Sequence, residues 1–189
     1  MSLVLTVVVV IAALGAFVGG RTGLAYWQGR GDYELVPDAV SVPKSGDDDV
    51  HRRVAAMPLQ VKSGYLPRGG GFDSSSWAMW SHDRVGSVDI KFARHRATAL
   101  RSGADVAADE LRRSRAHSAA YVQVTPLSGL GDEAFEVFAN GGITVNVRMR
   151  NIVLFIEFTA RTDRAELRRV TGTLMKTSIG MVEKINAQA

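Results

Sequence analysis

The side chains that could do chemistry are few and widely spaced in this chain of 189 residues, which contains no cysteine. The absence of cysteine excludes a thiolate metal site, a cysteine nucleophile and a disulfide scaffold. The four histidines are His51, His82, His95 and His117. They show neither the two-histidine helical spacing nor the nearby carboxylate of a metal site. The sequence therefore predicts no metal ion and no cofactor.

Serine and acidic residues show no catalytic pattern either. Ser74–Ser76 lack the Gly-x-Ser-x-Gly elbow that exposes a nucleophile. Asp132 and Glu133 are adjacent, so on a strand they would point to opposite faces and make a poor acid–base pair. We predict that the chain is not an enzyme. A small envelope hydrolase is the minor alternative, and it would need His82 or His95 within hydrogen-bonding reach of one of the three serines.

Aromatic residues beside a glycine-rich stretch indicate a binding site instead. The segment Gly64–Ser76 is rich in turn formers and is predicted to be a loop. Trp77 and Trp80 follow it and project from opposite faces of one strand, so only one of them can join the main core. The other is either a binding residue or part of a small cluster that holds the loop down. The candidate ligand- or partner-binding residues are Trp77, Trp80, His82, Gly129, Gly131 and Asp132.

The distribution of charge argues against a nucleic-acid partner. The chain has 23 Lys and Arg, 19 Asp and Glu, and a formal net charge of +4. Nucleic-acid binding needs positive charge gathered on one stripe with stacking aromatics. Here the basic stretch Arg94–Arg101 is followed by the acids of Asp105–Glu110, so much of the field cancels locally.

The first twenty residues are predicted to be a membrane anchor. Ser2–Gly20 holds no charged residue, and its 19 residues at 1.5 Å rise span roughly the 30 Å hydrocarbon core of a bilayer. Arg21 ends the run, and Tyr26 and Trp27 follow where an aromatic belt would sit. A cleaved signal peptide is the alternative, because Leu14–Ala16 offers small residues after the apolar stretch, although no Lys or Arg precedes it.

These signals divide the chain into three parts. Residues 1–21 are predicted to be a transmembrane signal-anchor helix and residues 22–49 a flexible juxtamembrane stalk, since the latter are rich in Gly, Pro, Asp and Ser. Residues 50–189 are predicted to be an extracytoplasmic domain. The expected partners are the lipid bilayer, through the N-terminal helix, and an unidentified protein or small molecule. The expected localisation is the cell membrane, single-pass, with the domain outside the cytoplasm. Arg21 and Arg30, counted by the positive-inside rule, weakly favour a domain inside the cytoplasm instead.

The globular part is predicted to be an α+β domain, with an antiparallel sheet of about five strands and two helices packed on one face. Asn140-Gly141 suits a type I′ hairpin turn. Apolar residues on both faces of the last strand predict that it is central. The expected strands are 77–80, 85–92, 134–139, 143–150 and 152–159.

Three segments carry local signals of a helix. Ser102 is predicted to cap a helix whose N3 residue is Asp105 and which runs to about Ala119; its thin apolar stripe includes Leu111. Asp163 and Glu166, three residues apart, are an acidic variant of the capping box and are predicted to start a long helix near the end of the chain. A short helical turn is expected from Asp49 through Val50, Val54 and Met57, ended by Pro58.

The stretch Leu-Ser-Gly-Leu-Gly-Asp-Glu-Ala-Phe at Leu127–Phe135, the strand Val145–Arg150 and the following Asn151–Leu154 resemble a family of actinobacterial cell-envelope domains. These are lipoprotein or signal-anchored sensor-like α+β proteins with a PsbP-like fold, mostly of unknown function. The match covers roughly Trp77–Ala187. The resemblance implies an extracytoplasmic domain with an antiparallel sheet and two helices. This chain lacks the lipid-modified cysteine of the lipoprotein members.

The predicted function is therefore a membrane-anchored extracytoplasmic binding or sensor-type domain without catalytic activity. The alternative is a structural subunit of a cell-envelope membrane assembly.

Overall fold

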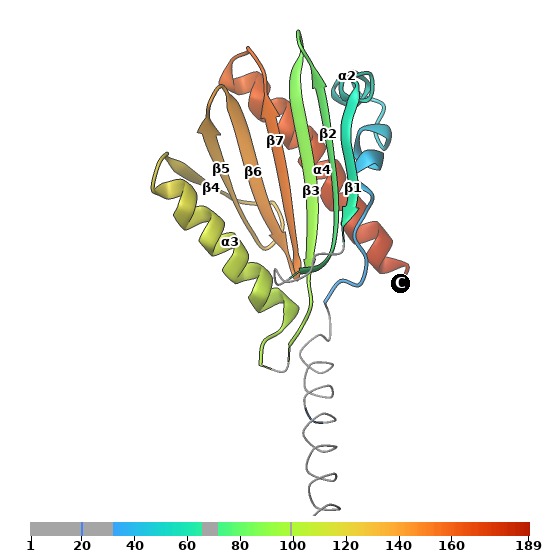
Figure 1. Cartoon of the computed structure of the whole chain (residues 1–189), viewed down its shortest axis with the longest axis vertical. Coiled ribbons are helices and arrows are strands. Elements are labelled where there is room, and N and C mark those ends of the chain that lie inside the picture. Colours follow the sequence, from blue (N-terminus) through green and yellow to red (C-terminus); the bar gives the residue numbers. More distant parts are fainter. Residues whose placement is uncertain (1–19, 21–31, 66–71, 99) are drawn as a thin grey trace, which may run out of the picture.

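The computed structural model of the chain describes Gly20 and residues 32–65, 72–98 and 100–189. In these ranges seven strands form an antiparallel sheet in the order β1-β2-β3-β7-β6-β5-β4 (Figure 1). The strands are β1 (Leu59–Tyr65), β2 (Phe72–His82), β3 (Gly86–His95), β4 (Val124–Leu127), β5 (Glu133–Ala139), β6 (Gly142–Met149) and β7 (Ile152–Thr159). The helices are the 3₁₀ helix η1 (Ala39–Lys44) and the α-helices α2 (Asp49–Ala55), α3 (Gly103–Ala119) and α4 (Arg164–Ala187).

The β5–β6 hairpin and the central strand form as the sequence predicts. Asn140 and Gly141 have φ angles of 51° and 74°, the left-handed pair that a type I′ turn requires. β7 is the fourth of the seven strands, between β3 and β6. Its side chains alternate between a fully buried face and a half-buried face that α3 covers in part, which explains why it is largely apolar on both.

One face of the sheet is covered by α4 together with η1 and α2. The N-cap carboxylate of Asp163 accepts a hydrogen bond from the Glu166 amide at 2.8 Å, which confirms the predicted start of α4. The main core lies between this helix and the sheet. Its largest fully buried members include Phe92, Ile90, Ile152, Leu154, Ile156, Leu174 and Met175.

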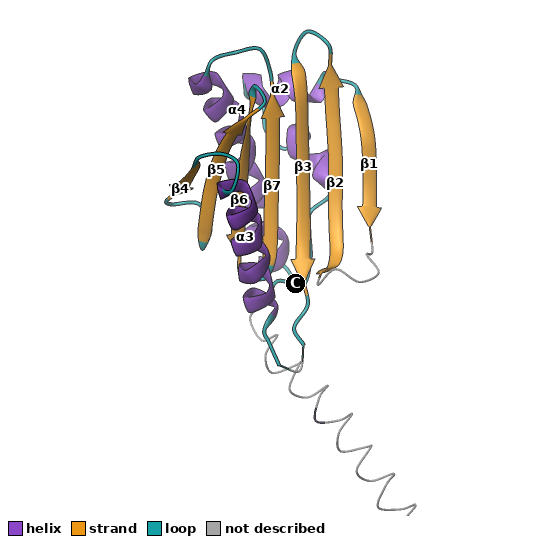
Figure 2. Cartoon of the chain, turned by 60° about the vertical axis from the view of Figure 1, so that its left-hand side comes forward, coloured by secondary structure: helices purple, strands orange, loops and turns teal. Residues whose placement is uncertain are grey.

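The opposite face carries α3 (Figures 1 and 2). Leu111 of α3 packs with Phe135 and Val137 of β5 in a second, smaller apolar cluster. Ser102 is the N-cap of α3 as predicted, and its side chain also forms a capping box with Asp105. The prediction that both helices pack on one face is wrong, because β5 and β7 present apolar side chains to both sides of the sheet and each side needs a cover.

The predicted number of five strands is also wrong. The two strands that were not predicted, β1 and β4, are the two edges of the sheet. Edge strands tolerate residues that a central strand excludes, and β4 contains Pro126. In addition, Ser74–Ser76 belong to β2 and not to a loop.

The described part of the predicted stalk, residues 32–49, is folded onto the sheet. Ala39 and Val42 of η1 are completely buried, and the Ala39 amide donates a hydrogen bond to Ser76 Oγ at 2.8 Å. The Tyr33 amide donates to Asn151 Oδ1 at 2.7 Å. Residues 22–31 lie outside the described residues.

None of the described helices is both long enough and apolar enough to pass through a membrane. The longest, α4, has 24 residues and carries seven Lys, Arg or Glu side chains. Apart from Gly20, the predicted anchor 1–21 lies outside the described residues. We correct the sequence prediction accordingly: the transmembrane helix, the lipid-bilayer partner and the single-pass cell-membrane localisation are withdrawn.

Candidate functional site

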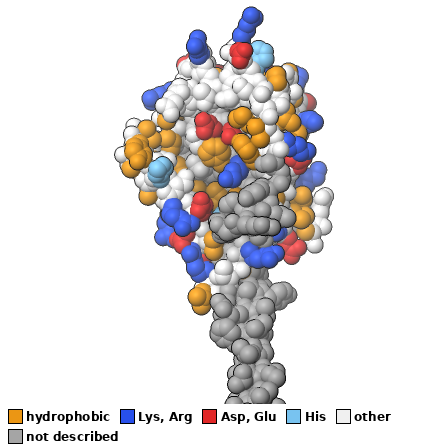
Figure 3. Space-filling model, in the orientation of Figure 1, with side chains coloured by type: hydrophobic (Ala, Val, Ile, Leu, Met, Phe, Trp, Pro, Cys, Tyr) orange, Lys and Arg blue, Asp and Glu red, His pale blue; other side chains and the backbone are white. Residues whose placement is uncertain are grey.

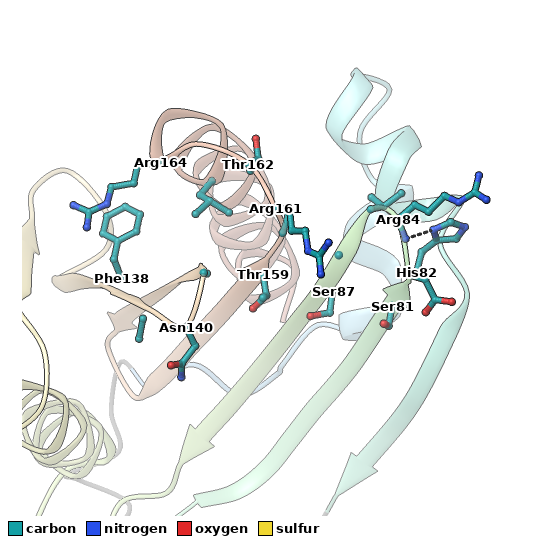
Figure 4. A pocket seen from close by; sticks show the side chains of 18 residues that line it. Ser81, His82, Arg84, Ser87, Phe138, Asn140, Thr159, Arg161, Thr162 and Arg164 are labelled. Atoms are coloured by element: carbon teal, nitrogen blue, oxygen red, sulfur yellow. Dashed lines mark hydrogen bonds between the residues drawn. The ribbon is translucent and has the colours of Figure 1, made fainter.

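A crevice of about 960 Å³ opens at the end of the sheet where β7 leads into α4. β3 and β6 flank β7, so the β2–β3 turn and the β5–β6 turn both lie beside the end of β7. The crevice is lined by these two turns, residues 81–87 and 138–142, and by residues 159–162, Arg164 and Leu167. We call it the hairpin crevice (Figure 4).

Arginine side chains give this crevice its charge. Arg161 lies near Thr159 and Ser87, and Arg84 extends from the outer rim (Figure 4). The Arg164 guanidinium lies over the Phe138 ring, 4.8 Å from its centroid. Within the described part of the chain no carboxylate forms an ion pair with any of these three arginines. Basic side chains project from this end of the molecule (Figure 3).

The neighbouring Arg168, unlike these three arginines, forms an ion pair with a buried carboxylate. Its Nε donates to Glu136 Oε1 at 3.0 Å, and Glu136 is only 3% exposed. The hydrogen bond and charge of Glu136 raise the pKa of Arg168. Its guanidinium also lies over the Phe138 ring, 5.0 Å from the centroid. Arg164 thus shares the ring with a paired arginine but has no such carboxylate.

The rest of the lining combines apolar side chains, such as Val85 and Leu167, with polar ones. Ser81, Ser87 and Thr159 bring hydroxyl groups and Asn140 brings an amide, while Asp83 is the acidic residue of the lining. A guanidinium presents a planar fork of donors that matches a carboxylate or a phosphate. The arrangement is therefore suited to holding an anionic group.

Of the predicted binding residues, the two tryptophans lie on opposite faces as expected. Trp80 is 4% exposed and packs in the main core. Trp77 is half-buried on the other face, where its indole N–H donates to the Asp89 carboxylate. The two therefore do not form one site.

His82 is the predicted binding residue that the structure places in the hairpin crevice. It lies in the β2–β3 turn, where its Nδ1 accepts a hydrogen bond from the Arg84 amide at 3.2 Å. Gly129, Gly131 and Asp132 lie in the β4–β5 loop, at the opposite end of the sheet.

The β4–β5 loop has a structural role. The Asp132 carboxylate pairs with Arg148 at 3.0 Å and accepts the Arg150 amide at 2.5 Å. Gly131 has a φ of 56°, and a Cβ there would lie 2.4 Å from the Arg148 carbonyl oxygen. The loop therefore needs glycine for backbone geometry.

The arginines and Asn140 of the hairpin crevice were missed as functional residues. In the sequence, Arg161 and Arg164 are two of many scattered arginines, and Asn140 is a turn residue. Only the strand order, which sets both hairpin turns beside the end of β7, brings them together.

The hydrolase alternative needs a histidine within hydrogen-bonding reach of Ser74, Ser75 or Ser76, and His82 does not meet this requirement. His82 is six residues beyond Ser76, the nearest of the three serines on β2, which is about 20 Å at the rise of a strand. Ser76 Oγ accepts the Ala39 amide on the α4 face. Ser75 and His95 lie on the α3 face as diagonal neighbours of the β2–β3 ladder. Among the described residues, no three His, Asp or Glu side chains are placed to hold a metal ion.

Two carboxylates face each other on the part of the sheet that α3 leaves open. Asp89 of β3 and Glu157 of β7 are paired in register. Burial raises the pKa of Glu157, and the negative charge of Asp89 raises it further. Burial also raises the pKa of Asp89, against the opposing effects of the Trp77 hydrogen bond and of Lys91. Acidic and hydrophobic side chains lie together on this face (Figure 3).

We expect Glu157→Gln to stabilise the protein at pH 7 by about 0.5 kcal/mol, because like charges directly opposite on neighbouring strands are unfavourable. A carboxyl whose pKa is raised on folding contributes stability below its ordinary value, here 4.5, and loses it as the pH rises through the folded value. The gain should therefore vanish towards pH 4, as measured by urea unfolding at both pH values. The exposed Glu183→Gln is the control, and a gain that persisted at pH 4 would contradict the argument.

Comparisons with known proteins do not assign the chain to a family. No protein-family model and no curated protein matches the chain. Among solved structures, a GTP-binding regulator from Thermotoga maritima is similar at a TM-score of 0.42 and 10% identity, over 79% of this chain and 95% of that chain. The Mll3558 protein from Rhizobium loti has a TM-score of 0.20 and 11% identity, over 80% and 91%. These likenesses are too weak to carry an argument, and the resemblance to actinobacterial envelope domains stays a prediction.

Proposed function

We propose that the chain is a non-catalytic binding domain that holds an anionic group, a carboxylate or phosphate, in the hairpin crevice. The observation that carries the proposal is the contrast between neighbouring arginines. Arg168 is paired with a buried carboxylate, whereas Arg161 and Arg164 line the crevice without an ion pair to any described residue. A ligand carboxylate or phosphate would supply the missing partner.

The dimensions and chemistry of the crevice agree with this proposal. A volume of about 960 Å³ is at the upper end of the roughly 300–1,000 Å³ range of small-molecule sites. Guanidinium groups stay protonated at every physiological pH, so they hold charge and do not transfer protons. The hydroxyls of Ser87 and Thr159 can donate hydrogen bonds to the same anion. We therefore favour recognition over catalysis at this site.

We expect Arg161→Gln to weaken the binding of inorganic phosphate at least tenfold, as measured by chemical-shift titration of the Gly86 and Gly142 amides. A hydrogen bond to a charged group contributes about 1.5–3 kcal/mol, and 1.4 kcal/mol corresponds to a factor of ten. Succinate replaces phosphate in a second titration to rank the two anion classes.

The matched control is Arg115→Gln, which removes the same charge from an exposed position on α3. At equal salt it should leave phosphate binding within a factor of two. If both variants bound phosphate equally weakly, the effect would be general charge attraction. If the chemical shifts of the two glycine amides did not change on adding phosphate to the wild-type protein, the site would be refuted.

A further inference from the structure

A second crevice, of about 250 Å³, lies between α3 and the sheet and shares no residue with the hairpin crevice. We call it the α3 crevice. Ala93 of β3 and Val153 and Phe155 of β7 give it an apolar lining. Glu110 and Ser114 line it from α3, and Lys91 and His95 of β3 are the basic residues of the lining.

The side chain of Asn146 is the unusual feature of this crevice. It belongs to β6, between Phe135 of β5 and Phe155 of β7 in the register of the sheet. Asn146 is only 6% exposed, and it lines the crevice. No described residue forms a hydrogen bond with its side-chain amide. Buried polar side chains nearly always have a partner in protein or ordered water, because an unpaired one is unfavourable.

The shape of the missing partner follows from the chemistry of the amide. An asparagine side chain presents one acceptor and a pair of donors in one plane, so it pairs best with a group that offers a donor beside an acceptor. Asparagine reads the edge of adenine in DNA with the same geometry. The complementary group is an N–H next to a C=O or ring nitrogen on a flat ring.

The size of the missing partner follows from the volume. A dry apolar cavity of 150 Å³ holds benzene, so about 250 Å³ holds a ring system of about ten heavy atoms. Phe155 and Val153 can contact the faces of such a ring. Glu110 pairs with Arg113 at 2.8 Å, so its charge is already balanced without a ligand.

Asn146 is 6% exposed, no described residue pairs with its side-chain amide, and the crevice that it lines has an apolar part of suitable size. From these observations we propose that the α3 crevice binds a flat bicyclic ring compound with a lactam-type edge that hydrogen-bonds to Asn146. The apolar lining contributes contact with the ring, and Asn146 sets its orientation. This site shares no residue with the hairpin crevice, so a test that refutes one proposal leaves the other unaffected.

The test uses two probes of nearly equal size, 2-quinolinone, which carries a lactam edge, and naphthalene, which has none. We expect the full-length protein to bind 2-quinolinone at least tenfold more tightly than naphthalene by ligand-observed NMR titration. The side-chain NH₂ signals of Asn146 should shift on addition of 2-quinolinone. Equal affinity for both probes, or binding of neither, would overturn the proposal and leave a crevice that holds water only.

Two variants distinguish specific recognition by Asn146 from nonspecific hydrophobic binding. Asn146→Leu should remove the preference for 2-quinolinone and raise the melting temperature, because it replaces an unpaired buried amide with an apolar side chain. Thr144→Val is the matched control, a polar-to-apolar change on the same face of β6 outside the crevice. It should keep the preference. An unchanged preference in Asn146→Leu, or its loss in Thr144→Val, would contradict a role for the amide.

Discussion

Replacing Asn151 with alanine is expected to lower the free energy of unfolding by about 3 kcal/mol, since three hydrogen bonds of about 1 kcal/mol each are lost. Asn151 is 2% exposed. Its Nδ2 donates to the Tyr33 and His95 carbonyls at 3.0 Å each, and its Oδ1 accepts the Tyr33 amide at 2.7 Å. The side chain thus ties the segment before η1 to the β6–β7 turn and the end of β3. Urea unfolding monitored by tryptophan fluorescence gives the value.

Asn186→Ala is the matched control for this prediction. Asn186 also bonds to the same N-terminal segment, accepting the Glu34 and Leu35 amides at 2.9 Å, but these bonds are exposed to solvent. Water replaces them when they are lost, so we expect a loss of about 1 kcal/mol. If Asn186→Ala destabilised the protein as much as Asn151→Ala, burial would not be the cause of the larger effect.

Asn151 also shows why the segment before η1 could not be assigned from the sequence. Residues 32–49 have the composition of a linker, and composition is what the prediction of a stalk rested on. The contact that orders this segment joins residues 118 positions apart. No local pattern in either part indicates that contact.

Signals that act within a few residues were read correctly. The signals are the N-cap at Ser102, the positive φ angles of Asn140-Gly141 and the alternation in Ile152–Thr159, and all three are local. The opposite sides of α3 and α4 and the two edge strands depend on how the sheet is ordered. The same limit applies to the candidate site, because the arginines of the hairpin crevice become neighbours only once β3, β7 and β6 are adjacent.

The second large effect is expected for Leu111→Ala, which should lower the free energy of unfolding by about 3 kcal/mol, within the range for leucine truncation in a core. Leu111 is fully buried against Phe135 and Val137. Gly103 and Ala107 are the other buried residues of α3. Leu111 is therefore the one large side chain buried along this helix, so its loss should loosen α3 more than the sheet.

Hydrogen exchange distinguishes this local effect from general destabilisation. In Leu111→Ala the amides of α3 should lose more protection than those of β7. Leu174→Ala on α4 removes the same atoms from a helix with seven buried residues, so its loss of protection should extend over helix and sheet together. Equal loss in α3 and β7 for Leu111→Ala would contradict the view that Leu111 is the main apolar contact between α3 and the sheet.

The same pair of variants connects the packing of α3 to its crevice. Glu110 and Ser114, which flank Leu111 on the helix, line the α3 crevice, so a loosened α3 no longer holds one of its walls in place. Leu111→Ala should therefore weaken 2-quinolinone binding, while Leu174→Ala should retain it wherever the protein is still folded. A ligand that bridges α3 and the sheet should in turn restore exchange protection to α3, because binding to the folded state alone stabilises the contacts it spans.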